Sequence, residues 1–245
     1  MQDNHMSFLQ RNNQVIGYTI GSVFAECIAT PIYLVRTNYL TTENISIKKT
    51  ILNIYNANGI IGFYNAIASA IFARIASASL KYLIYSELKY SRGNTQDQIF
   101  SNMLNGCMAG LFASFFVHPI DVITNTQQRL KSVNKKMLSR KVLYAGFSQT
   151  IIRNLALYSL LFPIFDYMKY LTNDDIVLAC VSTSFISTCV LQPIELLRTR
   201  YMAQQYTQKI TFKSCYRGFH ITYLANMLHF TIAMNIASLF IPKKQ

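Results

Sequence analysis

The stretch Gln192–Arg198 (QPIELLR) occurs in two further versions, His118–Thr124 (HPIDVIT) and Thr30–Arg36 (TPIYLVR). Each version places a proline inside an apolar segment, where the missing N–H and the ring bend an α-helix. The second and fifth residues after the proline share one helical face, and in Gln192–Arg198 they are an acid and a base. Because the versions recur about every 80 residues, the chain is predicted to hold three repeats. The predicted helix kinks are at Pro31, Pro119 and Pro193.

A second short motif, tyrosine followed by any residue and then a small one, appears after each proline and before another apolar segment. We call the proline-containing motif the proline word and this second motif the Tyr-x-small word. Its three copies are Tyr64–Ala66, Tyr144–Gly146 and Tyr216–Gly218. The repeating unit is therefore predicted to be a helix, a polar loop with a short helix, this Tyr-x-small word, and a second helix. The predicted organisation is an N-terminal tail at 1–13 and repeats at 14–92, 93–172 and 173–245.

The composition indicates a membrane protein. Of 245 residues 51% are hydrophobic and only 13% are charged, whereas a typical soluble domain carries about 25% charged residues. Each of six apolar stretches reaches the roughly 20 residues that a bilayer core requires. They carry polar residues on one side, which favours a bundle with a polar interior over a soluble array of six helices. The stretches are 14–40, 66–90, 98–128, 147–170, 175–203 and 219–242.

The placement of the charge restricts the function further. The net charge is +13, and the basic residues concentrate in the loops after the first, third and fifth apolar stretches. The positive-inside tendency puts these loops on one face, with both termini opposite. Dispersed around spanning helices, this charge does not favour nucleic acid as a partner. The five cysteines lack paired spacing, so no disulfide framework, metal site or other cofactor is expected. With no catalytic triad or phosphate-cradling glycine loop in the sequence, an enzyme is not expected.

Together the two words resemble the signature of the mitochondrial carrier family. That signature is Pro-x-acid-x-x-base after each odd helix and an aromatic-basic-Gly word before each even helix, and the resemblance covers nearly the whole chain. It implies an all-α membrane protein with six transmembrane helices in three pseudo-threefold repeats around a central cavity, open alternately to either side. It also implies a monomeric solute exchanger of the mitochondrial inner membrane, with anionic lipids at short surface helices such as 47–57.

The resemblance also implies a gate, in which acids and bases of the proline words pair between odd helices. In one of the three pairs both charges are missing, so neither residue is left as a buried ion without its partner. Removing only one partner of a buried ion pair would cost roughly 3–5 kcal/mol. Gln128 matches the family's glutamine brace. The contacts expected here are Arg36–Glu195, Asp121–Arg198 and a neutral contact between Tyr33 and Thr124.

A second gate is expected at the other end of the cavity, on the even helices. There the family has an aromatic-acid-x-x-base word, which only Phe165–Lys169 matches fully. The acid of the second helix is displaced by one position, and the sixth helix has neither charge. We therefore predict that the resting protein favours the state with the proline-side gate shut. The residues expected in this second gate are Asp166, Lys169, Glu87 and Lys89.

The family's substrate contacts lie about seven residues after the small residue of the Tyr-x-small word. The positions expected to bind substrate are Arg74, Lys81, Arg153, Asn154, Asn226 and Glu26. Basic side chains at membrane depth usually face the interior of a bundle, and three of them together favour an anion of more than one charge, phosphate or carboxylate. Glu26 is either a structural partner of one of these bases or a proton- or substrate-coupling group, and His229 is expected to be packed and hydrogen-bonded.

The sequence leaves three functions open. The first is exchange of anionic metabolites, above all nucleotides. The chain's composition, rich in Ile, Asn and Tyr, is similar to that of carrier-like proteins of giant DNA viruses. This resemblance favours nucleotides and deoxynucleotides as substrates. Tyr82, Tyr85, Tyr158 and Phe162 either stack on a base or pack in the core. The second is a carboxylate or phosphate carrier, proton-coupled through Glu26. The third is a membrane adaptor that keeps the fold without transporting.

Overall fold

The computed structural model describes residues 2–42, 45–92, 98–129, 139–205 and 212–240, except for the side chains of some residues within these ranges. The described residues form helices joined by turns. Six helices are long: α1 (Gln2–Thr41), α3 (Ile67–Arg92), α4 (Gln98–Gln128), α6 (Phe147–Leu171), α7 (Ile176–Met202) and α9 (Phe219–Leu239). Four are short: α2 (Ile47–Asn58), the 3-10 turn η1 (Ile60–Tyr64), α5 (Arg140–Leu143) and α8 (Phe212–Cys215).

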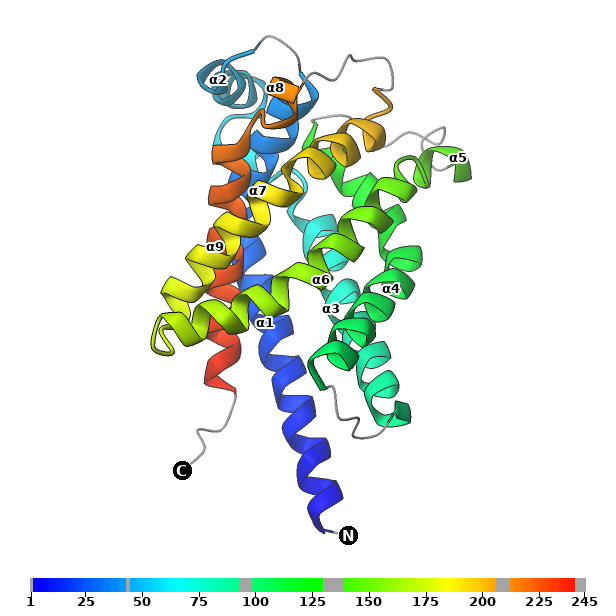
Figure 1. The fold of residues 1–245 in the computed structure, drawn as a ribbon. Helices are drawn as coiled ribbons and strands as arrows, with labels where there is room; N and C mark the ends of the chain where they lie inside the picture. Colours follow the sequence, from blue (N-terminus) through cyan, green and yellow to red (C-terminus); the bar gives the residue numbers. More distant parts are fainter. Residues whose placement is uncertain (1, 43–44, 93–97, 130–138, 206–211, 241–245) are drawn as a thin grey trace.

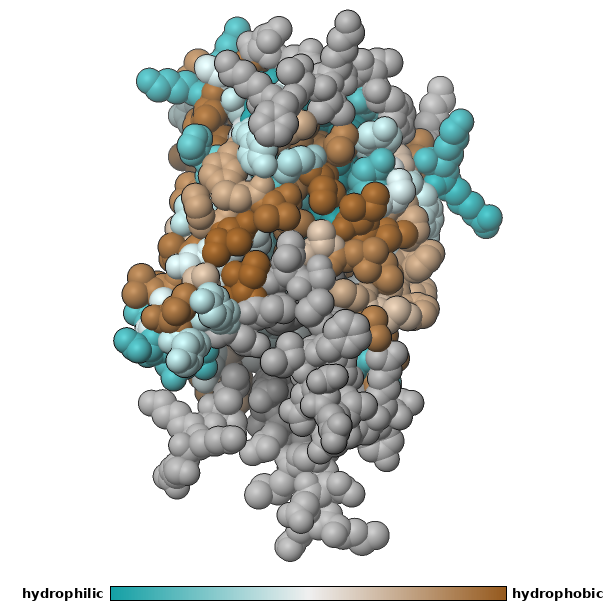
Figure 2. Space-filling view, viewed as in Figure 1, coloured by the Kyte–Doolittle hydropathy of each residue, from teal (hydrophilic) through white to brown (hydrophobic). Residues whose placement is uncertain are grey.

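The long helices pack in a closed ring in the order α1, α3, α4, α6, α7, α9 and back to α1. The start of α1 and the end of α9 lie at one end of the ring, and α2, α5 and α8 lie at the other, which we call the loop side (Figure 1). Apolar side chains cover the middle of the face in Figure 2, and polar ones gather toward the loop side. This distribution fits helices whose outer surfaces contact lipid.

Four described segments are long and apolar enough to cross a membrane: Ile16–Thr41, Ile60–Lys81, Leu104–Gln128 and Ile176–Met202. The two remaining long helices, α6 and α9, have 25 and 21 residues, or more than about 30 Å at 1.5 Å per residue. The chain is thus an all-α, multi-pass membrane protein, as predicted. One boundary was wrong: α1 begins at Gln2, so most of the expected tail at 1–13 continues the helix. No proline or glycine precedes Gly17 to end it.

The hydrogen bonds around the prolines explain why the two sequence words occur together. Pro119 has no N–H for the Phe115 carbonyl, and the Tyr144 hydroxyl donates to that carbonyl at 3.2 Å. In the third repeat the Tyr216 hydroxyl donates at 3.3 Å to the carbonyl of Cys189, four residues before its proline. In the second and third repeats the tyrosine of the word therefore satisfies an acceptor that the proline leaves without a donor.

The residue before the proline ties the same two words together a second time. The Nε2 of His118 donates to the Ala145 carbonyl at 3.2 Å, and the Nε2 of Gln192 donates to the Arg217 carbonyl at 2.8 Å. Ala145 and Arg217 are the middle residues of their Tyr-x-Gly words. The second and third repeats are thus each closed on themselves by two contacts between the odd helix and the start of the even helix.

The glycine of the word lets the even helix begin against the next odd helix. Gly146 and Gly218 have φ values of 77° and 75°, a left-handed conformation that residues with a Cβ rarely adopt. A Cβ on Gly146 would lie 3.0 Å from the Cβ of Tyr201 near the end of α7, and one on Gly218 would lie 2.8 Å from Leu40 near the end of α1. The word therefore fixes contacts between repeats as well as within one.

We expect Tyr144→Phe to lower the free energy of unfolding by about 1 kcal/mol, because the Phe115 carbonyl then loses its donor. Thermal unfolding of the purified protein in detergent measures this change. Tyr170→Phe is the matched control, since Tyr170 is 80% exposed on the outside of α6. Equal loss of stability in the two variants would show that the hydroxyl of Tyr144 does not act through the proline-freed carbonyl.

Candidate transport site

A cavity of about 280 Å³ lies on the axis of the ring and is lined by residues of all six long helices. Its charged lining comes from the proline words and from positions deeper in the bundle. Among the described lining residues five are basic and three are acidic, an excess of two positive charges with the histidines neutral. These are Arg36, Arg74, Lys81, Arg153, Arg198, Glu26, Asp121 and Glu195.

Two ion pairs join the odd helices at the loop side of the cavity. A guanidinium nitrogen of Arg36 on α1 lies 2.5 Å from Glu195 on α7, with both side chains about nine-tenths buried. Arg198 on α7 lies 2.6 Å from Asp121 on α4. The four residues are those that the resemblance pairs, so these contacts tie α7 to both of the other proline helices.

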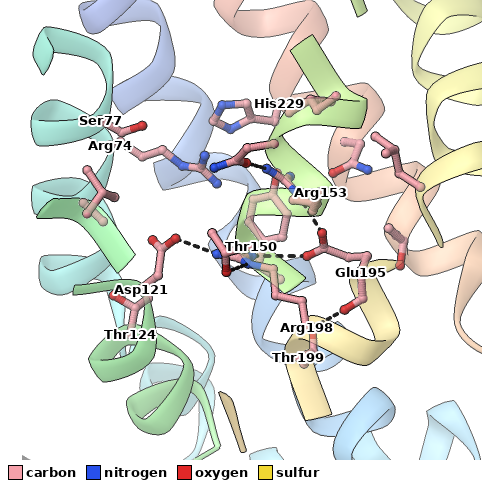
Figure 3. A pocket seen from close by; sticks show the side chains of 18 of the residues that line it. Arg74, Ser77, Asp121, Thr124, Thr150, Arg153, Glu195, Arg198, Thr199 and His229 are labelled. Atoms are coloured by element: carbon pink, nitrogen blue, oxygen red, sulfur yellow. Dashed lines mark hydrogen bonds and ion pairs between the residues drawn. The ribbon is translucent and has the colours of Figure 1, made fainter. Parts of the chain in front are cut away.

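Glu195 also accepts from a third helix, which the sequence reasoning missed. Arg153 on α6 donates through Nε to Glu195 at 2.8 Å, and Arg198 lies 3.5 Å from the other oxygen of the same carboxylate. Figure 3 shows Arg153 turned toward Glu195 from above and the guanidinium of Arg198 turned toward it from the left. One buried carboxylate thus holds three guanidinium groups, and Arg153, expected to contact substrate, is bonded to the gate acid.

The neutral contact between Tyr33 and Thr124 is not a hydrogen bond in this structure. The Thr124 hydroxyl donates to Ile120 of its own helix, while the Tyr33 ring lies beneath the guanidinium groups of Arg36 and Arg74, at 5.9 and 5.8 Å. Tyr33 therefore accepts two cations on its π face. The contact between Tyr33 and Thr124 stays a prediction.

Gln128 joins α1 to α4 where the third ion pair would lie. Its side-chain oxygen accepts from the Thr37 hydroxyl at 2.7 Å, and its carbonyl accepts from the Asn38 amide at 2.6 Å. The predicted brace thus connects these helices by uncharged hydrogen bonds. No compensating charge is needed there, because neither Tyr33 nor Thr124 is ionised.

Beyond the ion pairs, side chains cap the ends of neighbouring odd helices. Arg129 after α4 donates to the Ala203 carbonyl after α7 at 3.2 Å, and Arg200 on α7 donates to the Leu40 carbonyl on α1 at 3.4 Å. With Asn38 on the Gln128 carbonyl, the contacts run from α1 to α4, to α7 and back to α1. Cations suit helix C-termini, so this ring adds a second layer of closure at the loop side.

Deeper in the cavity, the acid and base of α1 and α3 form another pair. Arg74 donates through Nε to Glu26 at 2.7 Å, and the Glu26 side chain is only 3% exposed. His229 on α9 lies 3.6 Å from the same oxygen. The sequence left two roles open for Glu26, a structural partner of a base or a coupling group. In this structure Glu26 is paired with Arg74.

The remaining expected contact residues also line the cavity. The Asn154 amide donates to Ser114 on α4 at 2.6 Å, and the Asn226 amide donates to Thr188 on α7 at 3.3 Å. Lys81 lies farther toward the terminal end of α3 and is half-buried. The six expected positions therefore face one space, although Arg74, Arg153 and the two asparagines are all engaged in contacts between helices.

The second expected gate is not assembled among the residues that the structure describes. Lys169 lies 3.4 Å from Asp174 in the α6–α7 turn, an exposed local pair, and Glu87 is exposed. The side chains of Lys89 and Asp166 lie outside the described residues, as do those of Tyr82, Tyr85, Tyr158 and Phe162. In this conformation the ion pairs that cross between repeats are those of the loop side.

We expect Glu195→Gln to destabilise the folded protein by roughly 3–5 kcal/mol, because three buried guanidinium groups lose their shared anion. Asp174→Asn is the matched control: it removes the exposed pair with Lys169 and should change stability by about 0–1 kcal/mol. Unfolding curves of both variants in one detergent give the comparison. A Glu195→Gln protein as stable as Asp174→Asn would mean that the carboxylate does not hold these helices together.

Comparison with known proteins agrees with this architecture. A family model described as "Mitochondrial carrier protein" matches residues 12–93. A mitochondrial carrier-like protein of Acanthamoeba polyphaga mimivirus is 28% identical over 239 residues, covering 96% of this chain and 98% of the relative. An S-adenosylmethionine mitochondrial carrier protein homolog of Drosophila melanogaster is 24% identical over 71% of this chain and 69% of its own length.

A third relative, a chloroplastic mitoferrin-like protein of Arabidopsis thaliana, is 23% identical over 65% of this chain and 44% of its own length. Members of this family are transporters and not enzymes. The six-helix ring, the kinked odd helices with paired ions and the polar cavity agree with these likenesses. The chain is thus similar to proteins of the mitochondrial carrier family along nearly its whole length, and its residues 12–93 match the family model.

Proposed function

We propose that this solute transporter exchanges anionic metabolites, most of all nucleotides and deoxynucleotides, by alternating access through the central cavity. The observation that carries the proposal is the excess of two positive charges among the described cavity residues. Arginine presents a planar fork that suits phosphate and carboxylate groups. Arg74 and Arg153 lie on different helices, so an anion with two charged ends can contact both.

The choice of nucleotides rests on lesser support. One relative is named for S-adenosylmethionine, whose adenosyl group is also found in adenine nucleotides, and another is viral. The described cavity also contains Tyr33, whose ring already lies against two guanidinium groups. The second candidate, a carrier of carboxylates or inorganic phosphate, is favoured by the polar pair Arg153–Asn154, which faces the cavity.

The proposed cycle uses Arg153 as the link between binding and gate. In this structure Arg153 is bonded to Glu195. A substrate anion that recruits Arg153 leaves Glu195 with Arg36 and Arg198, and the closure at the loop side loses one of its three cationic contacts. Substrate binding favours opening of the loop side only if the anion binds the open state more tightly than the closed state.

The proposal also includes the oligomeric state, the membrane, the repeat boundaries and the lipid contacts of the protein. We place the protein as a monomer in the mitochondrial inner membrane, with repeats at 14–92, 93–172 and 173–245. Lys48 and Lys49 are exposed on α2, which lies at the loop side, and they suit anionic lipid head groups.

Reconstituted liposomes separate these functions. Vesicles loaded with unlabelled ATP, malate or phosphate are supplied with the same labelled compound outside, and dATP is tested beside ATP. Flux of ATP and dATP alone supports nucleotide exchange, and flux of malate or phosphate alone supports the second candidate. Flux of none of these compounds would favour a membrane adaptor that keeps the fold without transporting.

We expect Arg153→Ala to reduce exchange at least 10-fold, because one charge-assisted contact of about 1.5–3 kcal/mol to the anion is lost. Arg140→Ala is the matched control, since Arg140 is exposed in α5 outside the cavity. Initial rates of labelled-substrate uptake measure both variants. Unchanged uptake by Arg153→Ala would remove Arg153 from the binding site.

The closure of the loop side is tested by labelling a cysteine introduced at Ser77, which lines the cavity on α3. A membrane-impermeant thiol reagent should label Ser77→Cys faster from the terminal side than from the loop side, because ion pairs and capped carbonyls cross the loop side. Labelling of the parent protein with its native cysteines provides the baseline. Equal rates from the two sides at rest would contradict a loop-side gate that is shut.

A further inference from the structure

One cluster in the cavity contains a titratable group, His229, that simple anion exchange does not require. It consists of Glu26 on α1, Arg74 on α3 and His229 on α9, and it lies deeper than the ion pairs of the loop side. Arg74 Nε and His229 Nδ1 lie 2.7 and 3.6 Å from the same oxygen of Glu26. A buried carboxylate with one permanent cation and one titratable neighbour is a site at which the charge can change.

His229 is placed to gain from a proton. Its side chain is 14% exposed, and its Nδ1 is buried without a hydrogen-bond partner among the described residues. A buried ring nitrogen without a hydrogen-bond partner raises the free energy of the folded protein. Protonation converts Nδ1 into a charged donor 3.6 Å from a carboxylate oxygen, close enough for a small movement to make a charge-assisted hydrogen bond.

The groups around His229 set the balance of charge. From α1, Glu26 and the Tyr33 ring face it, the latter with ring centroids 6.2 Å apart, and from α3 Arg74 faces it. Figure 3 shows Arg153 of α6 below His229 and turned to Glu195. One turn before His229 on α9, Asn226 contacts the uncharged Thr188 of α7. While Arg74 is bonded to Glu26, a proton on His229 would add an uncompensated positive charge.

We propose that His229 binds a proton together with the substrate anion, so that the carrier moves one proton with each anion. This inference rests on the proposed function, in which Arg74 contacts the anion. When the anion draws Arg74 away from Glu26, the buried carboxylate loses its cation. A hydronium ion in the cavity then transfers its proton to Nδ1 of His229 and becomes water, and the imidazolium pairs with Glu26. Release of the anion returns Arg74 to Glu26 and expels the proton.

The test measures uptake of labelled ATP, malate and phosphate into proteoliposomes with the outside at pH 6, 7 or 8 and the inside at pH 7.5. One coupled proton predicts that uptake rises by up to about tenfold per unit of external acidification. His229→Gln should make the remaining uptake independent of the pH gradient. His220→Gln is the matched control, because His220 is exposed at the loop-side start of the same helix and should leave the pH dependence unchanged.

A fluorescent pH indicator inside the vesicles gives the second readout. Wild-type protein should acidify the lumen as the anion enters, and His229→Gln should not. Anion uptake by the wild type that ignores the pH gradient overturns this inference and leaves the proposed function standing. A pH dependence that persists in His229→Gln also overturns it, and would assign the proton to another group such as Glu26. Absence of wild-type flux for all three anions counts against the proposed function and this inference together.

Discussion

The carboxylate of Glu195 joins three of the long helices at the loop side. It bonds to Arg36 on α1, Arg153 on α6 and Arg198 on its own helix α7, and Arg198 in turn reaches Asp121 on α4. Three buried cations around one anion are stable only while that anion is in place. The relative positions of α1, α6 and α7 at the loop side therefore depend on a single negative charge, and Asp121 adds α4 through Arg198.

The scaffold that holds Glu195 is built from the consequences of a missing N–H. Each proline leaves a carbonyl without a donor inside a spanning helix, where lipid offers none. In the second and third repeats a tyrosine from the start of the next helix supplies the donor, and the residue before the proline bonds to the same word. The bend and the loop closure are thus one device, which explains why the two words recur together.

The loop-side closure combines strong and weak contacts in two layers. Ion pairs form the inner layer, and arginine and asparagine donors on helix C-terminal carbonyls form the outer one. The α1–α4 boundary lacks an ion pair and is joined by Gln128 instead. Uncharged hydrogen bonds contribute less than buried charge pairs when broken singly, so this boundary is the weakest of the three joints of the closure.

The sequence by itself determined the six apolar helices, their ends to within a few residues except at the N-terminus, and the repeat of a proline word with a Tyr-x-Gly word. These follow from local rules: proline position, apolar period and glycine at a left-handed position. The resemblance supplied the partners of Arg36 and Asp121, since the ring order fixes which odd helices meet. Only the tertiary structure decided that Arg153 bonds to Glu195, that Arg200 caps α1, and that Lys169 turns to Asp174. Long flexible side chains choose among several acceptors within reach, and that choice depends on the distances between helices far apart in the chain.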